Sequence, residues 1–185
     1  MTATPTELLC QFYQAGQMAM AGRPPRPASR PAGVALDAAT SLAQKMGLDV
    51  LLTEAIAADS REWAAEQAGL ARATPAGTLI LDGGAVPRNG QGRDGGTLEC
   101  LLALGLALDG ASAIWAIACD RRPRDGVAGA FLCPDSLARA MAAGMDLAAM
   151  LAGREAQDLF RHLGDLVPAG EDTSARGDFR AILVL

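Results

Sequence analysis

The chain has 185 residues, enough for one sizeable domain, and half of them are apolar while only 4% are aromatic. Its formal net charge of −5 argues against nucleic acid or an anionic membrane as a main partner. Four widely spaced cysteines form no C-x-x-C pair and the single histidine lies far from them, so no zinc site is expected. No apolar run has the length of a membrane span and the N-terminus carries no apolar leader segment, so the sequence predicts a cytoplasmic protein.

The first expected element is a helix that follows the cap sequence Thr-Pro-Thr-Glu at residues 4–7 and ends near Gly22. The threonine caps the helix, the proline suits the first helical position, and Glu7 reaches back to the cap. The apolar stripe of this helix has to be buried, either against the chain's own domain or against another protein. In the second alternative the residues that contact a protein partner are Leu8, Leu9, Phe12, Tyr13 and Met20.

A proline- and arginine-rich segment then separates this helix from the rest of the chain, because four prolines between residues 23 and 31 favour an extended, semi-rigid linker. The expected organisation is a helix at residues 1–22, a linker at 23–32 and one α/β domain at 33–185. An apolar helical stripe runs from Leu36 to Met46 and ends at Gly47. Residues 48–53 are then expected to form a short buried strand.

Strands and helices alternate through the remaining sequence. Helices are expected at residues 57–72, 97–108, 135–143, 147–152 and 155–163, and strands at 78–82, 112–119, 130–133 and 180–185. Alternation with continuously apolar strands is typical of sheets covered by helices on both faces. The sequence therefore predicts a three-layer α/β/α sandwich with a mostly parallel or mixed sheet.

A glycine-rich segment lies between the strand at 78–82 and the helix at 97–108. Such a segment directs backbone N–H groups and a helix N-terminus at one place, which favours an anion, although a purely structural turn has the same composition. A Walker loop is excluded because no Gly-Lys-Ser/Thr occurs, and G-x-G-x-x-G at Gly90 follows its strand too late for a dinucleotide fingerprint. The candidate ligand-binding residues are Gly83, Gly84, Gly92, Arg93, Gly95 and Gly96.

Two further polar segments offer candidate groups. Residues 120–126 are expected to form a loop, in which Asp120, Arg121 and Arg122 either bind a phosphate or carboxylate or simply face solvent. Asp178 precedes the last strand and offers a carboxylate for magnesium or for hydrogen bonds. No nucleophile, histidine and acid can be assembled into a catalytic set, so no catalytic residue and no metal ligand is assigned.

From about Leu36 to Leu185 the order of motifs resembles the C-terminal part of type II glycerate 2-kinases, the MOFRL domain, several of which carry the older label hydroxypyruvate reductase. The family's A-L-E-A-A, S-G-G-E and G-x-G-x-G-G-R-N-x-E are similar to A-L-D-A-A from residue 35, D-G-G-A from residue 82 and G-Q-G-R-D-G-G-T-L-E from residue 90. The segment D-S-L-A-R-A at 135–140 and the ending at 178–184 also match. The resemblance implies an α/β fold and ATP- and magnesium-dependent phosphorylation of glycerate.

The departures from the family pattern fall on its polar positions. Ala85 stands where the family has glutamate, and Gly96 and Thr97 stand where it has arginine and asparagine. Phosphoryl transfer depends on positioning and charge stabilisation, and losing one such contact costs on the order of 10²–10³ in rate. The family also handles glycerate and ATP in a cleft beside a larger N-terminal domain, which a helix and a linker replace here.

The leading hypothesis is therefore a non-catalytic MOFRL-like protein that binds a protein partner, a second copy of itself or a small anionic ligand, with no cofactor assigned. One alternative is a glycerate 2-kinase component that uses ATP and magnesium and is completed by a separate N-terminal-domain protein. Another is an enzyme that acts on a small carboxylate through Arg93, Asp120, Arg121, Arg122 and Asp178.

Overall fold

The computed structural model describes residues 3–21, 31–54, 59–84, 96–169 and 178–185. One sheet contains the strands β1 Asp49–Thr53, β2 Thr78–Asp82, β3 Ile114–Arg124, β4 Val127–Leu132, β5 Leu166–Pro168 and β6 Phe179–Val184. The helices are α1 Pro5–Met20, α2 Pro31–Lys45, α3 Ser60–Ala73, α4 Thr97–Leu108, α5 Ser136–Ala142, α6 Leu147–Gly153 and α7 Ala156–Leu163. None of the helices in the described ranges is both long and apolar enough to cross a bilayer.

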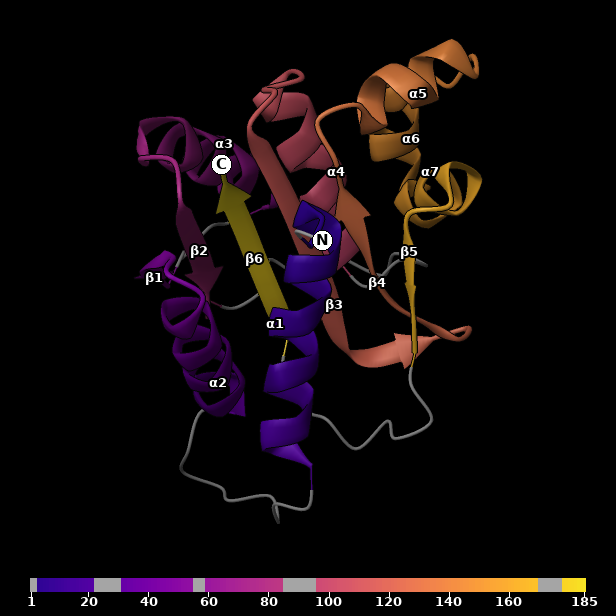
Figure 1. Cartoon of the computed structure of the whole chain (residues 1–185). Helices are drawn as coiled ribbons and strands as arrows, with labels where there is room; N and C mark the ends of the chain where they lie inside the picture. The colour runs from indigo at the N-terminus through magenta and orange to yellow at the C-terminus, as the bar shows by residue number, and fades with distance from the viewer. Residues whose placement is uncertain (1–2, 22–30, 55–58, 85–95, 170–177) are drawn as a thin grey trace.

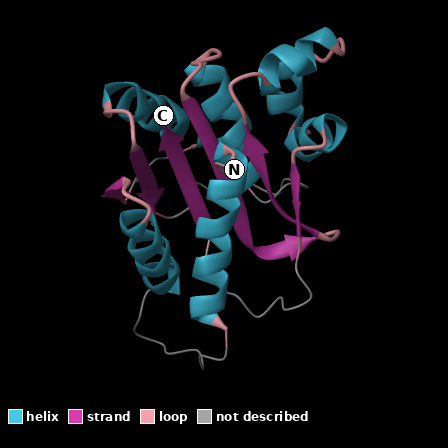
Figure 2. Ribbon diagram, in the orientation of Figure 1, coloured by secondary structure: helices cyan, strands magenta, loops and turns pink. Residues whose placement is uncertain are grey.

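The sheet order is β1-β2-β6-β3-β4-β5, and helices cover both of its faces (Figures 1 and 2). Helices α1 and α2 pack on one face, and α3 to α7 pack on the other, so the three-layer α/β/α sandwich is confirmed. Only β1 and β2 are parallel, because the last strand, β6, inserts antiparallel between β2 and β3. The mixed sheet is therefore confirmed, and the mostly parallel alternative is wrong.

Helix α1 packs against the chain's own domain. Thr4 and Glu7 form the expected capping box at its start. Leu9 and Phe12 are fully buried against α2 and the sheet, and Gly16 lies so close to α2 that an added Cβ would be 3.1 Å from that of Ala35. The structure thus favours the first alternative for this helix. Residues 22–30 of the expected linker region lie outside the described residues, and α2 already begins at Pro31.

Two predictions about strands are wrong. The strand at 48–53 was expected to be buried, but β1 is an edge strand, with Leu51 and Leu52 exposed by 37% and 55%. Residues 120–124 are not a loop: β3 continues through them and turns back into β4 at Asp125 and Gly126, with φ of 51° and 74°. Two residues with positive φ form the hairpin turn for which Asp-Gly is a strong signal.

A half-buried polar network attaches α5 to the turn between α7 and β5. Arg139 Nη2 lies 2.6 Å from Asp165 Oδ2, and the Ser136 hydroxyl donates to the same oxygen at 3.1 Å. Arg139 Nη1 also donates to the carbonyl of Leu163 at 3.1 Å. This network therefore joins residues 135–140, which resemble the family closely, to the turn that precedes β5.

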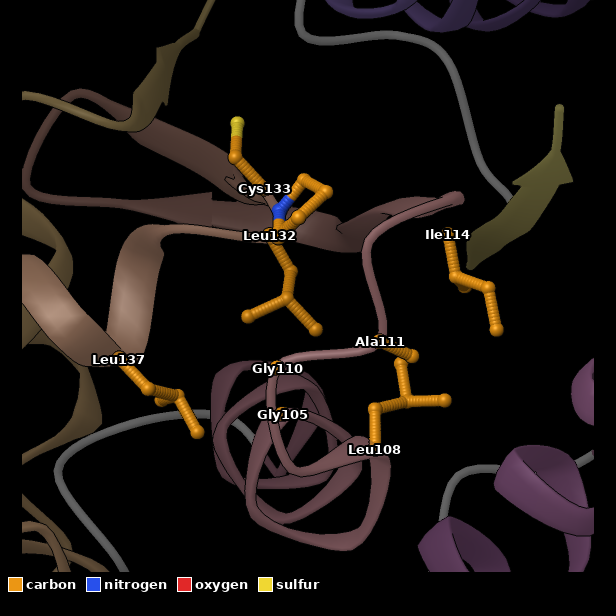
Figure 3. A pocket seen from close by; sticks show the side chains of 9 residues that line it. Gly105, Leu108, Gly110, Ala111, Ile114, Leu132, Cys133 and Leu137 are labelled. Carbon is orange, nitrogen blue, oxygen red and sulfur yellow. The ribbon is translucent and has the colours of Figure 1, made fainter.

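A small apolar cavity lies beside the C-terminal half of α4 (Figure 3). Leu108, Ile114, Leu132 and Leu137 line it, and Cys133 lies at its rim. An added Cβ at Gly105 would lie 2.9 Å from Leu132 Cδ1, so a larger residue there would require that leucine side chain to shift. With aliphatic side chains as its main lining, this cavity offers an anion no charged partner, so the candidate site lies elsewhere.

Candidate functional site

The end of β2, the start of β6 and the middle of β3 lie side by side at one end of the sheet, where β2 leads into the glycine-rich segment. Asp82 at the end of β2 pairs with Arg180 in β6, and Cys119 in β3 pairs with Phe179. Continuing the second register by one residue places the residue after Cys119 opposite the residue before Phe179. The fold thereby brings four of the sequence-predicted site residues to the same end of the sheet, namely Gly83, Gly84, Asp120 and Asp178.

The centre of this sheet end is a buried ion pair between Asp82 and Arg180. Their side chains are 3% and 2% exposed, and Arg180 Nε lies 2.9 Å from Asp82 Oδ2. Trp63 Nε1 donates to the same carboxylate oxygen at 2.8 Å, and the Gly84 N–H donates to the other at 2.8 Å. Both oxygens of Asp82 therefore accept hydrogen bonds, and the carboxylate fixes the turn that follows β2.

The guanidinium of Arg180 is only partly used. Its Nη2 donates to the carbonyl of Gly84, and its carbon lies 5.7 Å from the centroid of the Trp63 ring. Its Nη1 is buried and has no hydrogen-bond partner in the described part of the chain. A buried donor without a partner costs about 1–3 kcal/mol, so native proteins usually supply such a group with water or a ligand.

Two other buried polar atoms, in the helices α3 and α4 on the same face of the sheet as Trp63, are in the same situation. The Thr97 hydroxyl at the start of α4 is buried, as is Gln67 Oε1, one helical turn after Trp63 in α3. Neither has a hydrogen-bond partner among the residues described. The guanidinium offers a donor, the hydroxyl offers a donor or an acceptor, and the amide oxygen offers an acceptor. The two donors suit an anionic oxygen, whereas the amide oxygen suits a hydroxyl group of the same small ligand.

The start of α4 adds a favourable field for such an anion. Gly96 precedes the helix with φ of 55° and supplies no side-chain cap. The N-terminal N–H groups of a helix carry positive partial charge and attract anions. Glu99 lies in the first turn, but its side chain is 9% exposed and its Oε1 lies 3.9 Å from Arg154 Nε, so an arginine offsets that charge.

Cys100, in the same region of α4, is not a nucleophile at neutral pH. Burial is the main cause that raises the pKa of its thiol to about 12, although nearby Arg180 acts in the opposite direction. Glu99 and Asp82 also raise this pKa. The Asp82–Arg180 pair therefore acts electrostatically on Cys100 in α4.

The structure positions the remaining sequence-predicted residues differently. Gly92, Arg93 and Gly95 lie outside the described residues, and Gly96 lies at the N-cap of α4. The backbones of Arg121 and Arg122 belong to strand β3. Of the candidate partner contacts, Leu9 and Phe12 are in the chain's own core and unavailable to a partner, whereas Leu8, Tyr13 and Met20 are half-buried.

Sequence reasoning missed Asp82, Arg180, Trp63, Gln67 and Thr97 as site residues. A usable signal existed for the ion pair, because Asp82 and Arg180 are charged residues at the ends of otherwise apolar strands. Such charges are rarely fully buried unless they are paired. In the described ranges, no group of three or more histidine, cysteine, aspartate or glutamate side chains could hold a metal ion.

Comparison with known proteins relates this fold to one family. Residues 78–175 match the MOFRL family. Two proteins from Agrobacterium vitis, both named as hydroxypyruvate reductases, are 39% and 36% identical to this chain over 82% of its length. These alignments cover 38% and 43% of the two relatives, so the chain spans about two fifths of their length.

Two solved structures share the fold. A glycerate kinase from Thermotoga maritima has a TM-score of 0.72 and 21% identity, over 83% of this chain and 40% of its own. A protein from Pyrococcus horikoshii has a TM-score of 0.69 and 16% identity, over 82% of this chain and 38% of its own. At these identities the likeness concerns the fold.

Proposed function

The chain belongs to the MOFRL family, and from that premise we propose that it binds a small anion of the carboxylate or phosphate class without turning it over by itself. The proposed site is the sheet end formed by β2, β6 and the start of α4. The observation that carries the proposal is the buried, unpartnered Nη1 of Arg180. Arg180 also acts electrostatically on Cys100 in α4, the helix whose N-terminus has no side-chain cap.

The polar atoms around that nitrogen support a carboxylate or phosphate as the ligand. An arginine N–H and a helix N-terminus both favour a negatively charged oxygen. The buried hydroxyl of Thr97 supplies a further donor. A ligand that accepted hydrogen bonds from both side chains would satisfy two buried groups at once.

We propose that the chain has no catalytic turnover by itself because it lacks polar side chains that the family motif carries. Where the family pattern has arginine and asparagine, this chain has Gly96 and Thr97, which leave the start of α4 without a charged side chain at either position. Charge stabilisation is the main source of catalysis in phosphoryl transfer. A site that keeps the fold but lacks these groups is better suited to binding than to turnover.

Ligand binding is tested on the full chain with glycerate, hydroxypyruvate and inorganic phosphate as probes. The chain has two tryptophans, and Trp63 donates to Asp82 in the site. In a Trp115→Phe background the fluorescence of Trp63 therefore reports occupancy. We expect saturable binding by at least one probe and an increase in the melting temperature at saturation. Absence of both effects with all three probes would refute the site.

A matched pair of variants tests whether the ligand binds at this end of the sheet. Thr97→Val and Thr40→Val each remove a buried hydroxyl without a partner, but Thr40 lies in α2 on the other face of the sheet. Loss of one hydrogen bond to an anion costs about 1.5–3 kcal/mol, which is roughly a ten- to hundredfold weaker affinity. We expect that loss for Thr97→Val alone. Equal affinity in both variants would exclude the Thr97 hydroxyl from the site.

A second candidate function is a glycerate kinase component that works with another protein. The fold of a glycerate kinase, of which this chain covers 40%, favours it. This candidate requires tight binding of magnesium–ATP and phosphorylation of glycerate when the missing part of the site is supplied. Enzyme-like phosphorylation by the purified chain alone would contradict the proposal of a non-catalytic protein.

A third candidate is an enzyme that acts on a small carboxylate. Asp120 and Asp178, which the register of β3 and β6 places opposite each other, favour it because paired acids can exchange protons with a substrate. Binding without reaction and catalysis are distinguished by incubating each carboxylate probe with the protein. The small molecules are then analysed by mass spectrometry. A chemically changed probe would favour this candidate over simple binding.

A further inference from the structure

The outer edge of β1 carries the densest group of exposed large hydrophobic residues in the described part of the chain. Six large hydrophobic residues of the described chain are more than a third exposed, and three of them, Met46, Leu51 and Leu52, lie within seven consecutive residues. Residues 46–53 contain no lysine, arginine or proline, and Asp49 is their single charged residue. Natural edge strands are normally guarded by such residues or kept very short.

The opposite edge strand of the same sheet, β5, is protected against pairing with another strand. Strand β5 has three residues, Leu166–Pro168, and ends in a proline that cannot donate a hydrogen bond. Strand β1 has five residues, Asp49–Thr53, and no such guard. The contrast within one sheet indicates that the β1 edge is left open for pairing.

The backbone groups that β1 offers to a partner follow from its pairing with β2. The Asp49 N–H donates to the carbonyl of Gly77, and the Thr53 carbonyl accepts from Gly83. In a parallel pair every second residue directs both backbone groups to its neighbour. Residues 49, 51 and 53 therefore face β2, and the N–H and C=O groups of Val50 and Leu52 point outward.

We propose that two copies of this chain associate by antiparallel pairing of their β1 strands about a two-fold axis at Leu51. In this register Val50 of one copy lies opposite Leu52 of the other. Opposed residues of this type exchange both of their hydrogen bonds, so all four outward groups of each copy are satisfied. The two sheets then join into one continuous sheet.

The charges and side chains favour a second copy as the occupant. Around Leu51 the pairing places Asp49 opposite Thr53, so no like charges oppose each other along the strand. Two-fold symmetry makes Leu51 its own partner, in a close non-hydrogen-bonded pair. A five-residue strand is small beside the roughly 800 Å² per partner of a standard interface, so we expect a dimer that dissociates on dilution.

The oligomeric state of the full chain is tested by sedimentation velocity from low-micromolar to sub-millimolar protein concentration. We expect the average mass to rise with concentration from that of one chain towards that of two. A single chain at every concentration would overturn the proposal and leave the edge to a different protein. Assembly beyond two copies would overturn the two-fold register.

Charge variants at the axis test the register itself. Leu51→Lys and Leu51→Glu each place two like charges opposite each other, so each variant alone is expected to be monomeric. Mixing the two variants is expected to restore a dimer of mixed composition. Dimerisation of either variant alone at the wild-type affinity, or failure of the mixture to associate, would refute the axis at Leu51.

Two more variants separate a lost interface from a lost fold. Leu52→Pro removes an outward N–H and leaves the pairing with β2 intact, so it is expected to abolish dimerisation while the melting temperature of the monomer is retained. Met18→Lys is the control. Met18 is 72% exposed but lies in α1, outside β1, so this variant is expected to dimerise normally. A dimer that persists in Leu52→Pro would contradict pairing through β1.

Discussion

Two arginine–aspartate ion pairs in this molecule differ in their burial and in the partners of their guanidinium groups. Arg139 spreads its guanidinium over the polar network beside β5: Nη1 binds a carbonyl, Nη2 binds Asp165, and Nε lies 3.2 Å from Asp135 Oδ2. Arg180 is more deeply buried beside Asp82, yet its Nη1 has no partner in the described part of the chain. The first arginine also has one buried nitrogen without a hydrogen bond, its Nε, but that nitrogen lies at ion-pair distance from Asp135, as expected of a structural clamp. Arg180 retains one N–H donor that can bind a group outside the described residues.

The largest expected difference between the pairs is their effect on stability. Arg180→Met leaves the Asp82 carboxylate buried without its charge partner, which costs about 3–5 kcal/mol. Arg139→Met removes a pair whose arginine side chain is 37% exposed, and such pairs contribute about 1 kcal/mol or less. Urea unfolding of both variants measures the two losses. Equal losses would contradict the distinction between the two pairs.

The sequence predicts those features of this arrangement that depend on residues close together in the chain. It does not predict the features that depend on distant residues. The bounds of β2 and α4 and the capping box of α1 were predicted correctly, because apolar periodicity and caps act over a few residues. The ion pair joins residues 98 positions apart, and its formation requires β6 to insert between β2 and β3. No local pattern carries that information.

The strand errors have a similar physical cause. Charged residues at 120–124 resemble a loop, but they continue β3 because the Asp-Gly turn at 125–126 pairs Arg124 with Val127 in β4. The sequence of β1 is as apolar as a buried strand, and only its place at the end of the sheet order makes it exposed. The candidate residues Asp120 and Asp178 were identified separately, and tertiary pairing brought them to one place.

A smaller effect is expected at Trp63, which connects the Asp82–Arg180 pair to α3. Trp63→Phe removes the hydrogen bond from Nε1 to Asp82, and a bond to a charged acceptor contributes about 1.5–3 kcal/mol. Trp115→Phe is the matched control, because Trp115 lies partly buried in β3 on the α1 and α2 side. Chemical denaturation should show the larger loss for Trp63→Phe. A larger loss for Trp115→Phe would mean that packing, not the hydrogen bond, dominates at these positions.

The smallest expected effect at neutral pH concerns the cysteine that neighbours each arginine. Burial raises the pKa of the Cys100 thiol to about 12 and also raises that of the half-buried Cys133. A thiol whose pKa is raised by folding stabilises the protein fully below its ordinary pKa of about 8.5 and loses that contribution as the pH rises through the folded value. Stability should therefore decline between about pH 8.5 and pH 12.

The two thiols can be separated by substitution and by reactivity. Cys100→Ala should flatten the alkaline decline in unfolding free energy more than Cys133→Ala does, because Cys100 is more deeply buried. In the native protein at pH 8, a thiol reagent should modify Cys133 faster than Cys100, since only a thiolate with solvent access reacts. Peptide mapping assigns the modified residue. Equal rates would mean that the start of α4 opens to solvent, and the ion pair beside it would then be less enclosed than the pair at Arg139.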